Sequence, residues 1–299
     1  MHSRKLLVFG GTGYVGSAIV RKALQRGWRV VSATRGGVPT PGSPLHDISA
    51  VTHQNHEDAL GQGSGDRATQ SPRPLEFVSL DAGSRSQVFE FMEDHLDATA
   101  VISCVGVLTR DHIEARRVCG DANVNIAAAL YEKASAVRRM VLISAEPPGR
   151  YASIFLKSRW ALKGYFLGKE IAERAVLENL GDRGAVLRPG FIHGTRYQAL
   201  GVGCVPVPLW LIGSPLEMAF RPLHCGGLLA PPISVEVVAE AALRAAESLG
   251  PCLQLDYYGM QQICGESNNV CGEPKEEKAA REPKKSDHYK NGSGDQGHK

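Results

Sequence analysis

The part of this chain that most limits its fold is a short apolar run leading directly into three evenly spaced glycines. Gly10, Gly13 and Gly16 follow that run, and a helical pattern continues to about residue 25. Gly10 allows a sharp turn, Gly13 lets backbone amides approach a phosphate, and Gly16 lets the helix lie close to the strand. The helix N-terminus adds free N–H groups and a partial positive charge. In this context the glycines predict a dinucleotide-binding turn.

A second apolar strand, residues 29–34, is followed by Arg35 rather than by an acidic residue. A carboxylate at this position would accept hydrogen bonds from the adenosine ribose and select NAD, whereas an arginine suits the additional phosphate of NADP. Arg35 is also compatible with a solvated loop. We expect NADP(H) to be preferred over NAD(H).

Strands and helices alternate along the rest of the chain. Apolar runs predict strands at 5–9, 75–80, 100–104, 140–144 and 185–188, and periodic segments predict helices at 14–25, 85–96, 112–135, 165–180 and 234–248. This order favours an α/β fold, a doubly wound parallel sheet of the Rossmann type, with a small C-terminal α/β region on the substrate side and a disordered tail.

Composition divides the chain into a body and a tail. Residues 1–250 are expected to form the nucleotide-binding domain, interrupted at 36–74 by a flexible insertion rich in Gly, Pro, Ser, His and Gln. Residues 251–299 are expected to be a low-complexity, disordered tail. On this interpretation, deletion of residues 40–72 leaves the stability unchanged.

The net charge of +3 gives no argument for a nucleic-acid partner. Seven cysteines, odd in number and scattered, indicate a reducing compartment and no metal site. No apolar window is long enough to span a membrane. Because the first strand begins by Lys5, no signal peptide is visible, so either the protein is cytosolic or a targeting segment has been removed or omitted.

Tyr165 and Lys169 are four residues apart and therefore lie on one face of a predicted helix. A neighbouring ammonium group favours the phenolate, so the pair would let Tyr165 act as an acid or base below its usual pKa of about 10. We take these two residues as the candidate catalytic pair. Lys169 is also expected to bond the nicotinamide ribose.

Residues 5–245 resemble the extended and atypical short-chain dehydrogenase/reductases. The similarity rests on the glycine turn, Asp81, the run 103–106, Asn123, Asn125, Tyr165, Lys169 and the run 187–194. The resemblance implies that a dinucleotide contacts Gly10, Thr12, Gly13, Tyr14, Val15, Gly16, Arg35, Asp81, Cys104, Val105, Gly106, Lys169 and Pro189. It is strongest for a mitochondrial and plastid subgroup with accessory proteins of coenzyme Q biosynthesis and of respiratory complex I. This implies a mitochondrial location and a membrane-associated complex or a prenylated quinone as partner.

One position departs from the family pattern. Active members carry serines or a threonine after the fifth strand, and the third of these hydroxyls polarises the substrate carbonyl. Here the run is Ser144-Ala145-Glu146, so a carboxyl group stands at the position of that hydroxyl. An ionised carboxylate does not stabilise negative charge developing on an oxygen. Conventional ketone reduction is therefore not expected.

Two other features each allow two interpretations. The segment 149–164 interleaves basic and aromatic residues, either as a surface loop docked on the core or as a contact for a membrane, a quinone or another subunit. His193 either packs in the pocket wall or takes part in catalysis.

Two functional hypotheses remain. The first is a NADP(H)-binding accessory or regulatory protein of a mitochondrial membrane assembly, in quinone biosynthesis or the respiratory chain. The second is an NAD(P)-dependent oxidoreductase, epimerase or dehydratase that uses Tyr165 and Lys169, with Glu146 or His193 in a modified role.

Overall fold

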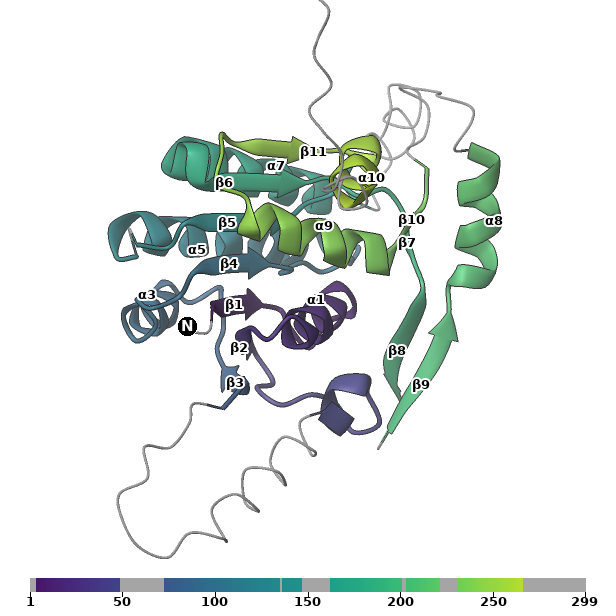
Figure 1. Cartoon of the computed structure of the whole chain (residues 1–299), viewed down its shortest axis with the longest axis horizontal. Coiled ribbons are helices and arrows are strands. Elements are labelled where there is room, and N and C mark those ends of the chain that lie inside the picture. Colours follow the sequence, from purple (N-terminus) through teal and green to yellow (C-terminus); the bar gives the residue numbers. More distant parts are fainter. Residues whose placement is uncertain are drawn as a thin grey trace, which may run out of the picture. The chain divides into compact units, whose positions relative to one another are not determined.

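The computed structural model describes residues 4–48, 73–134, 136–146, 162–200, 203–220 and 231–265. A seven-stranded sheet, parallel throughout, forms its centre, in the order β11-β6-β5-β4-β1-β2-β3 (Figure 1). The strands are β1 (Lys5–Phe9), β2 (Arg29–Thr34), β3 (Leu75–Ser79), β4 (Ala100–Ser103), β5 (Arg139–Ile143), β6 (Gly184–Leu187) and β11 (Leu253–Leu255). The chain crosses from one half of the sheet to the other between β3 and β4, which confirms the predicted doubly wound fold.

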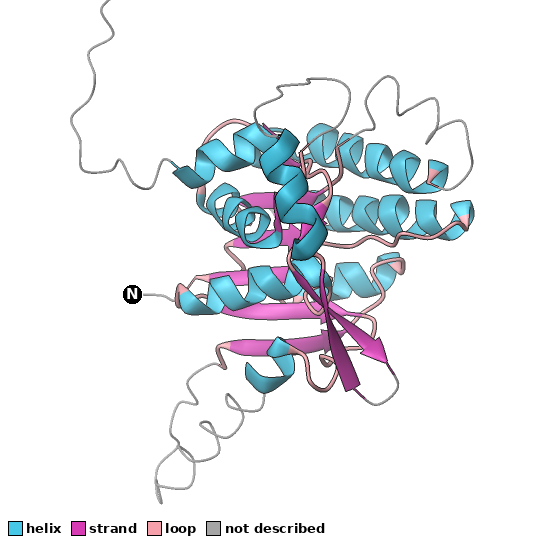
Figure 2. Ribbon diagram, turned by 90° about the vertical axis from the view of Figure 1, so that its right-hand side faces the viewer, coloured by secondary structure: helices cyan, strands magenta, loops and turns pink. Residues whose placement is uncertain are grey.

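Helices cover both faces of this sheet (Figures 1 and 2). One core layer holds α1 (Tyr14–Gln25), α9 (Val235–Glu247) and α10 (Tyr257–Gly265). The opposite layer holds α3 (Arg85–Glu93), α5 (Ala122–Glu132) and α7 (Lys163–Leu180), with α4 (His112–Arg116) and the π-helical turn η1 (Arg117–Asp121) leading into α5. Within the described part of the chain, no helix is both long and apolar enough to cross a membrane.

A smaller region follows β6. Short strands β7 (Ile192–His193) and β10 (Ile233–Ser234) pair in parallel, and β8 (Thr195–Leu200) pairs with β9 (Gly203–Pro208) as an antiparallel hairpin before α8 (Trp210–Phe220). The sequence pattern gave no elements between 200 and 232, because the prolines of β9 argue against a central strand. In a two-stranded hairpin both strands are edges, where proline is tolerated.

The boundary predicted at residue 250 is wrong. β11 pairs with β6, and Tyr257 and Met260 of α10 are buried in the core. The sequence missed these elements because β11 has only three residues, too few to show a strand pattern. The body therefore continues to at least Gly265, and the rest of the predicted tail lies outside the described residues.

The flexible insertion predicted at 36–74 is also wrong in its first part. Residues 44–48 form a helical turn, and the side chain of Leu45 is only 1% exposed, packed in the core layer of α1. Apolar residues as few as Val38, Leu45 and Ile48 in a polar, proline-rich segment give no periodic signal. Residues 49–72 of that segment are not among those described.

Arg139 joins the N-terminal ends of β5, β6 and β11, on one side of the sheet. Its guanidinium group is buried and donates hydrogen bonds to the carbonyl oxygens of Asp182 at 2.6 Å, Ser248 at 2.9 Å and Gly250 at 3.0 Å. Burial lowers the pKa of Arg139, but its charge is spread over several carbonyl dipoles. One side chain therefore connects β5 to the turn before β6 and to the segment before β11.

We expect Arg139→Met to destabilise the fold by about 3 kcal/mol, because it leaves several buried carbonyl groups without a donor. The measurement is urea denaturation. Arg138→Met is the matched control, since Arg138 is the exposed neighbour and its loss should cost less than about 0.5 kcal/mol. Equal effects of the two changes would contradict this role for Arg139.

We also expect Leu45→Ala to lower the free energy of unfolding by about 3 kcal/mol, because it creates a cavity against α1. Val38→Ala, at a side chain that is 73% exposed in the same segment, should be close to neutral. A neutral Leu45→Ala variant in thermal or urea unfolding would restore the interpretation of this segment as a linker.

Candidate functional site

The turn between β1 and α1 is built by contacts that leave no room for side chains. Gly10 has a φ of 78°, which favours glycine, and its carbonyl oxygen accepts a hydrogen bond from the Gly13 amide at 3.0 Å. A Cβ atom on Gly16 would lie only 2.2 Å from that same oxygen. The first turn of α1 therefore lies directly on the end of β1, as the glycine spacing predicts.

The N-terminus of α1 is suited to an anion. Gly13 is the N-cap residue and offers no side chain to accept from the first amides of the helix, and the first turn contains no acidic residue. These amides and the helix dipole together favour a phosphate group.

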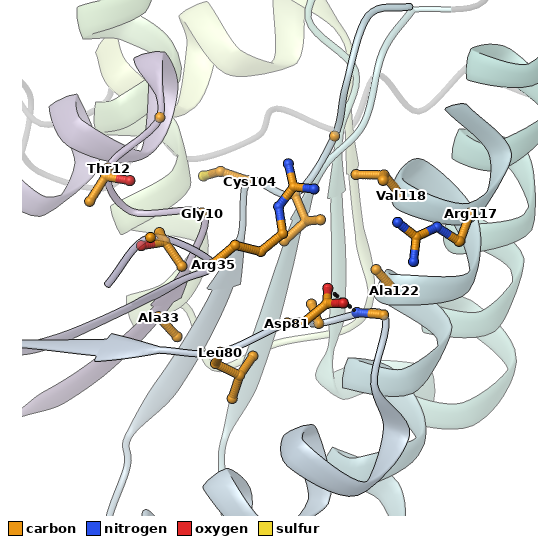
Figure 3. Close-up of a pocket in the computed structure, with 17 residues that line it drawn as sticks. Gly10, Thr12, Ala33, Arg35, Leu80, Asp81, Cys104, Arg117, Val118 and Ala122 are labelled. Atoms are coloured by element: carbon orange, nitrogen blue, oxygen red, sulfur yellow. Dashed lines mark hydrogen bonds between the residues drawn. The ribbon is translucent and has the colours of Figure 1, made fainter. Parts of the chain in front are cut away.

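A cavity of about 360 Å³ opens at this edge of the sheet (Figure 3). It lies at the switch point between the parallel neighbours β1 and β4, after which the chain continues into opposite halves of the sheet. Its lining comes from the ends of β1, β2, β3 and β4 and from the π-helical turn: Gly10, Thr12, Gly13, Ala33, Thr34, Arg35, Gly36, Leu80, Asp81, Ala82, Gly83, Cys104, Val105, Gly106, Arg117, Val118 and Ala122. Ligands of open α/β sheets bind at such a switch point.

Eight of the predicted dinucleotide contacts line this cavity: Gly10, Thr12, Gly13, Arg35, Asp81, Cys104, Val105 and Gly106. Figure 3 shows the Arg35 side chain reaching into it from the end of β2. Asp81 Oδ1 accepts a hydrogen bond from the Gly83 amide at 3.0 Å, and this bond fixes the loop after β3. Their role as cofactor contacts stays a prediction.

Tyr14, Val15, Gly16, Lys169 and Pro189 are not part of the cavity lining. The Tyr14 hydroxyl lies beside Gly194, where a Cβ atom would meet its oxygen at 2.8 Å. Burial raises the pKa of Tyr14 to about 12. Pro189 presents its carbonyl oxygen to the Glu146 amide at 2.9 Å.

Sequence reasoning missed the wall opposite Arg35. Arg117, Val118 and Ala122 line the cavity because a π-helical turn interrupts the helix between α4 and α5. Helical periodicity predicts one continuous helix over 112–135, and no residue pattern in this segment marks the change of winding. The other missed lining residues adjoin predicted ones, such as Gly36 beside Arg35 and Leu80 beside Asp81.

Lys169 is held by the ends of two strands. Its ammonium group is buried and donates to the carbonyl oxygens of Ile143 at 2.7 Å and Val105 at 3.1 Å. Burial lowers the pKa of Lys169. α7 is thereby fixed against the segment after β4, next to the cavity-lining residue Gly106.

The expected effect of Lys169 on Tyr165 is wrong in this structure. Burial, with a smaller contribution from nearby Cys119, raises the pKa of the Tyr165 phenol to about 12. The ammonium group of Lys169 gives its hydrogen bonds to backbone carbonyls, so it does not favour the phenolate. Helical spacing predicts that Tyr165 and Lys169 lie on one face of the helix, but it does not predict the direction in which the Lys169 side chain points.

The end of β5 carries a group of charged side chains. Ser144 Oγ donates a hydrogen bond to Glu173 of α7, and Arg188 binds the same carboxylate with Nη2–Oε2 at 2.7 Å. Glu146 lies beside this pair. Burial and the nearby Asp256 raise the pKa of Glu146, while Arg188 opposes them. The position of the family's hydroxyl thus holds a half-buried carboxyl group.

His193 lies in the smaller region, where it is 5% exposed. Its Nδ1 is 3.4 Å from Ser214 Oγ, and a Cβ atom on Gly213 would lie 2.2 Å from the His193 Cβ. These contacts place His193 in the packing between β7 and α8. Among the described residues, no group of three or more His, Cys, Asp or Glu side chains is arranged to hold a metal ion.

The parallel sheet with a glycine turn at its switch point is a Rossmann-type nucleotide-binding fold. Residues 6–175 match the NAD dependent epimerase/dehydratase family, and the chain belongs to this family.

Known proteins resemble the chain over most of its length. An uncharacterized chloroplastic protein of Arabidopsis thaliana is 32% identical in an alignment of 260 residues that covers 82% of this chain and 72% of the plant protein. Two solved structures share the fold. WbmH of Bordetella bronchiseptica, in complex with NAD+, is 18% identical and has a TM-score of 0.53, with 86% of this chain and 76% of that chain covered. UDP-glucose 4-epimerase of Thermotoga maritima, with UDP-glucose, is 14% identical with a TM-score of 0.51 over 84% and 76%.

We expect Gly13→Asp to abolish dinucleotide binding while the protein stays folded. Aspartate is a good N-cap residue, but its carboxylate would repel a phosphate at the start of α1. Gly13→Ser, an N-cap without the charge, is the matched control and should keep more of the affinity. Calorimetric titration with NADPH and a thermal melt of each variant check both statements. Equal affinity of the two variants would contradict the assignment of this turn to the pyrophosphate.

Proposed function

We propose that this protein binds NADP(H) chiefly as a structural ligand and acts as an accessory or regulatory protein of a mitochondrial membrane assembly, in quinone biosynthesis or the respiratory chain. One observation carries the proposal: the phosphate turn and crevice are complete, while the position of the catalytic hydroxyl holds the Glu146 carboxyl group. A protein that uses the nucleotide only to order its crevice needs the phosphate turn but does not need the catalytic hydroxyl group.

The preference for NADP(H) rests on Arg35. The Arg35 side chain lines the crevice just after β2, and the strand ends without a carboxylate that would accept from a ribose hydroxyl. Within the described residues, Arg35 forms no ion pair, so its guanidinium group is available to a phosphate. We expect Arg35→Ala to weaken the binding of NADPH and to leave the binding of NADH unchanged. Calorimetric titration with both ligands checks this. Equal affinity of the unmodified chain for NADH and NADPH would contradict the preference.

The proposed membrane assembly is supported by the family resemblance and by one surface. α8 exposes several apolar side chains, among them Trp210 at 48%, Leu211 at 56% and Ile212 at 66%. Such a face suits contact with another protein or a lipid surface. The predicted contact segment 149–164 lies outside the described residues except for residues 162–164. The mitochondrial location stays a proposal that rests on the resemblance alone.

The alternative is an NAD(P)-dependent epimerase, dehydratase or oxidoreductase. The membership of the chain in the epimerase/dehydratase family favours it, as does the place of Lys169 beside the crevice. In this case Tyr165 would exchange a proton with the substrate. Its pKa of about 12 in the structure makes it a poor base at neutral pH.

Two substitutions separate these functions. If the nucleotide is mainly structural, Tyr165→Phe removes one hydroxyl group and should leave NADPH retention, complex assembly and complementation of a strain without the gene intact. Gly13→Asp should lose all three, because the empty crevice no longer orders its loops. A Tyr165→Phe protein that retains NADPH and fails to complement would overturn the accessory role and establish catalysis.

A further inference from the structure

Arg117 is a charged side chain of the crevice that neither the glycine turn nor the catalytic pair accounts for. It lines the cavity from the π-helical turn, on the wall opposite Arg35 (Figure 3). Asp81 lies between these two walls in the same view. Two guanidinium groups thus face one end of the crevice, and their surroundings differ.

The backbone that carries Arg117 is firmly placed. The Asn123 side chain donates to the carbonyl oxygen of Cys119 within the turn at 2.8 Å and accepts from Ser103 Oγ at 2.5 Å. Gly120 packs on Gly168 of α7, where a Cβ atom would lie 3.2 Å from the facing Cα. π-helical turns are rare and often occur at functional sites. This one aims Arg117 and Val118 at the crevice.

The guanidinium plane of Arg117 is fixed by Glu114. Nε donates to Glu114 Oε2 at 3.1 Å and Nη2 to Oε1 at 3.4 Å, so both carboxylate oxygens are used. The backbone of Glu114 is held at the start of α4, since its amide donates to Asp111 Oδ1 at 3.1 Å. The remaining edge of Arg117 points toward the loop after β3: a Cβ atom on Gly83 would be 3.5 Å from Arg117 Nη1.

These contacts favour a flat, neutral group over a phosphate at this end of the crevice. The charge of Arg117 is already paired with Glu114 and faces Asp81, both of which oppose a second anion. The neighbouring lining is apolar at Leu80, Val118 and Ala122. A planar guanidinium group stacks well on an aromatic face.

We propose that Arg117 binds the face of the adenine ring and that Glu114 is the positioning residue that holds its guanidinium plane. Arg35, which has no ion pair among the described residues, is left for the phosphate on the ribose. This inference rests on the proposed function, because it concerns the adenine end of the same dinucleotide. It adds a contact that supports NADPH and NADH equally, whereas Arg35 supplies the preference for NADPH.

The test is the affinity for NADPH and for NADH, measured by the nicotinamide fluorescence of each complex. Arg117→Met should weaken both ligands by the same factor, about tenfold, because both carry adenine. Arg117→Lys should show the same loss, since an ammonium group keeps the charge but not the plane. Arg116→Met, at an exposed neighbour outside the cavity lining, is the matched control and should change neither affinity.

Glu114→Gln should lower the affinity for both dinucleotides by about threefold in the otherwise unmodified chain. In the Arg117→Met background it should cause no further loss of affinity, and a double-mutant cycle measures this difference. A purely structural role of Glu114 would give the same loss in both backgrounds and would overturn its positioning role.

Three other outcomes overturn the adenine contact: unchanged affinity of Arg117→Met, a loss confined to NADPH, or recovery in Arg117→Lys. The last two would assign Arg117 to a phosphate. If the unmodified chain binds neither dinucleotide, the proposed function fails first, and this inference fails with it.

Discussion

The whole arrangement depends on the close approach of α1 to the end of β1. Because Gly16 lies against the carbonyl oxygen of Gly10, the helix leaves the strand at once and its first amides face the carboxyl edge of the sheet. A side chain at Gly16 would move α1 away from β1. Because α9 packs against α1, the packing of α9 would change as well. The crevice, the phosphate turn and the core layer of α1 therefore all depend on this one contact between the backbones of Gly10 and Gly16.

The sequence predicted those parts of the fold that repeat a strong pattern. The seven-stranded sheet required only apolar runs alternating with periodic helices, and six of its strands were located to within a residue or two. The seventh, β11, was missed because three residues are too few to show a strand pattern. Leu45 shows the same limit: its burial depends on where α1 and β3 leave space, which is a property of the packing and not of residues 36–48.

The candidate site also contains residues that the sequence predicts and residues that it does not. Residues in short loops after strands, such as Arg35, Asp81 and Cys104, could be found from the sequence because the end of a parallel strand fixes their position. Arg117 could not, since it reaches the crevice through a change of helical winding that no residue type signals. The direction of Lys169 was also hidden, because its partners are backbone carbonyls whose positions only the folded sheet defines.

The bonds of Arg139 have a consequence for the order in which the chain acquires structure. Its acceptors at Ser248 and Gly250 lie more than a hundred residues later in the chain, next to β11. While the protein emerges from a ribosome, β5 can pair with β4 before these carbonyls exist, so the guanidinium group must stay hydrated and β6 must present an open edge. Completion of the sheet therefore waits for β11, and the edge of β6 is exposed to wrong strand pairing until β11 has been made.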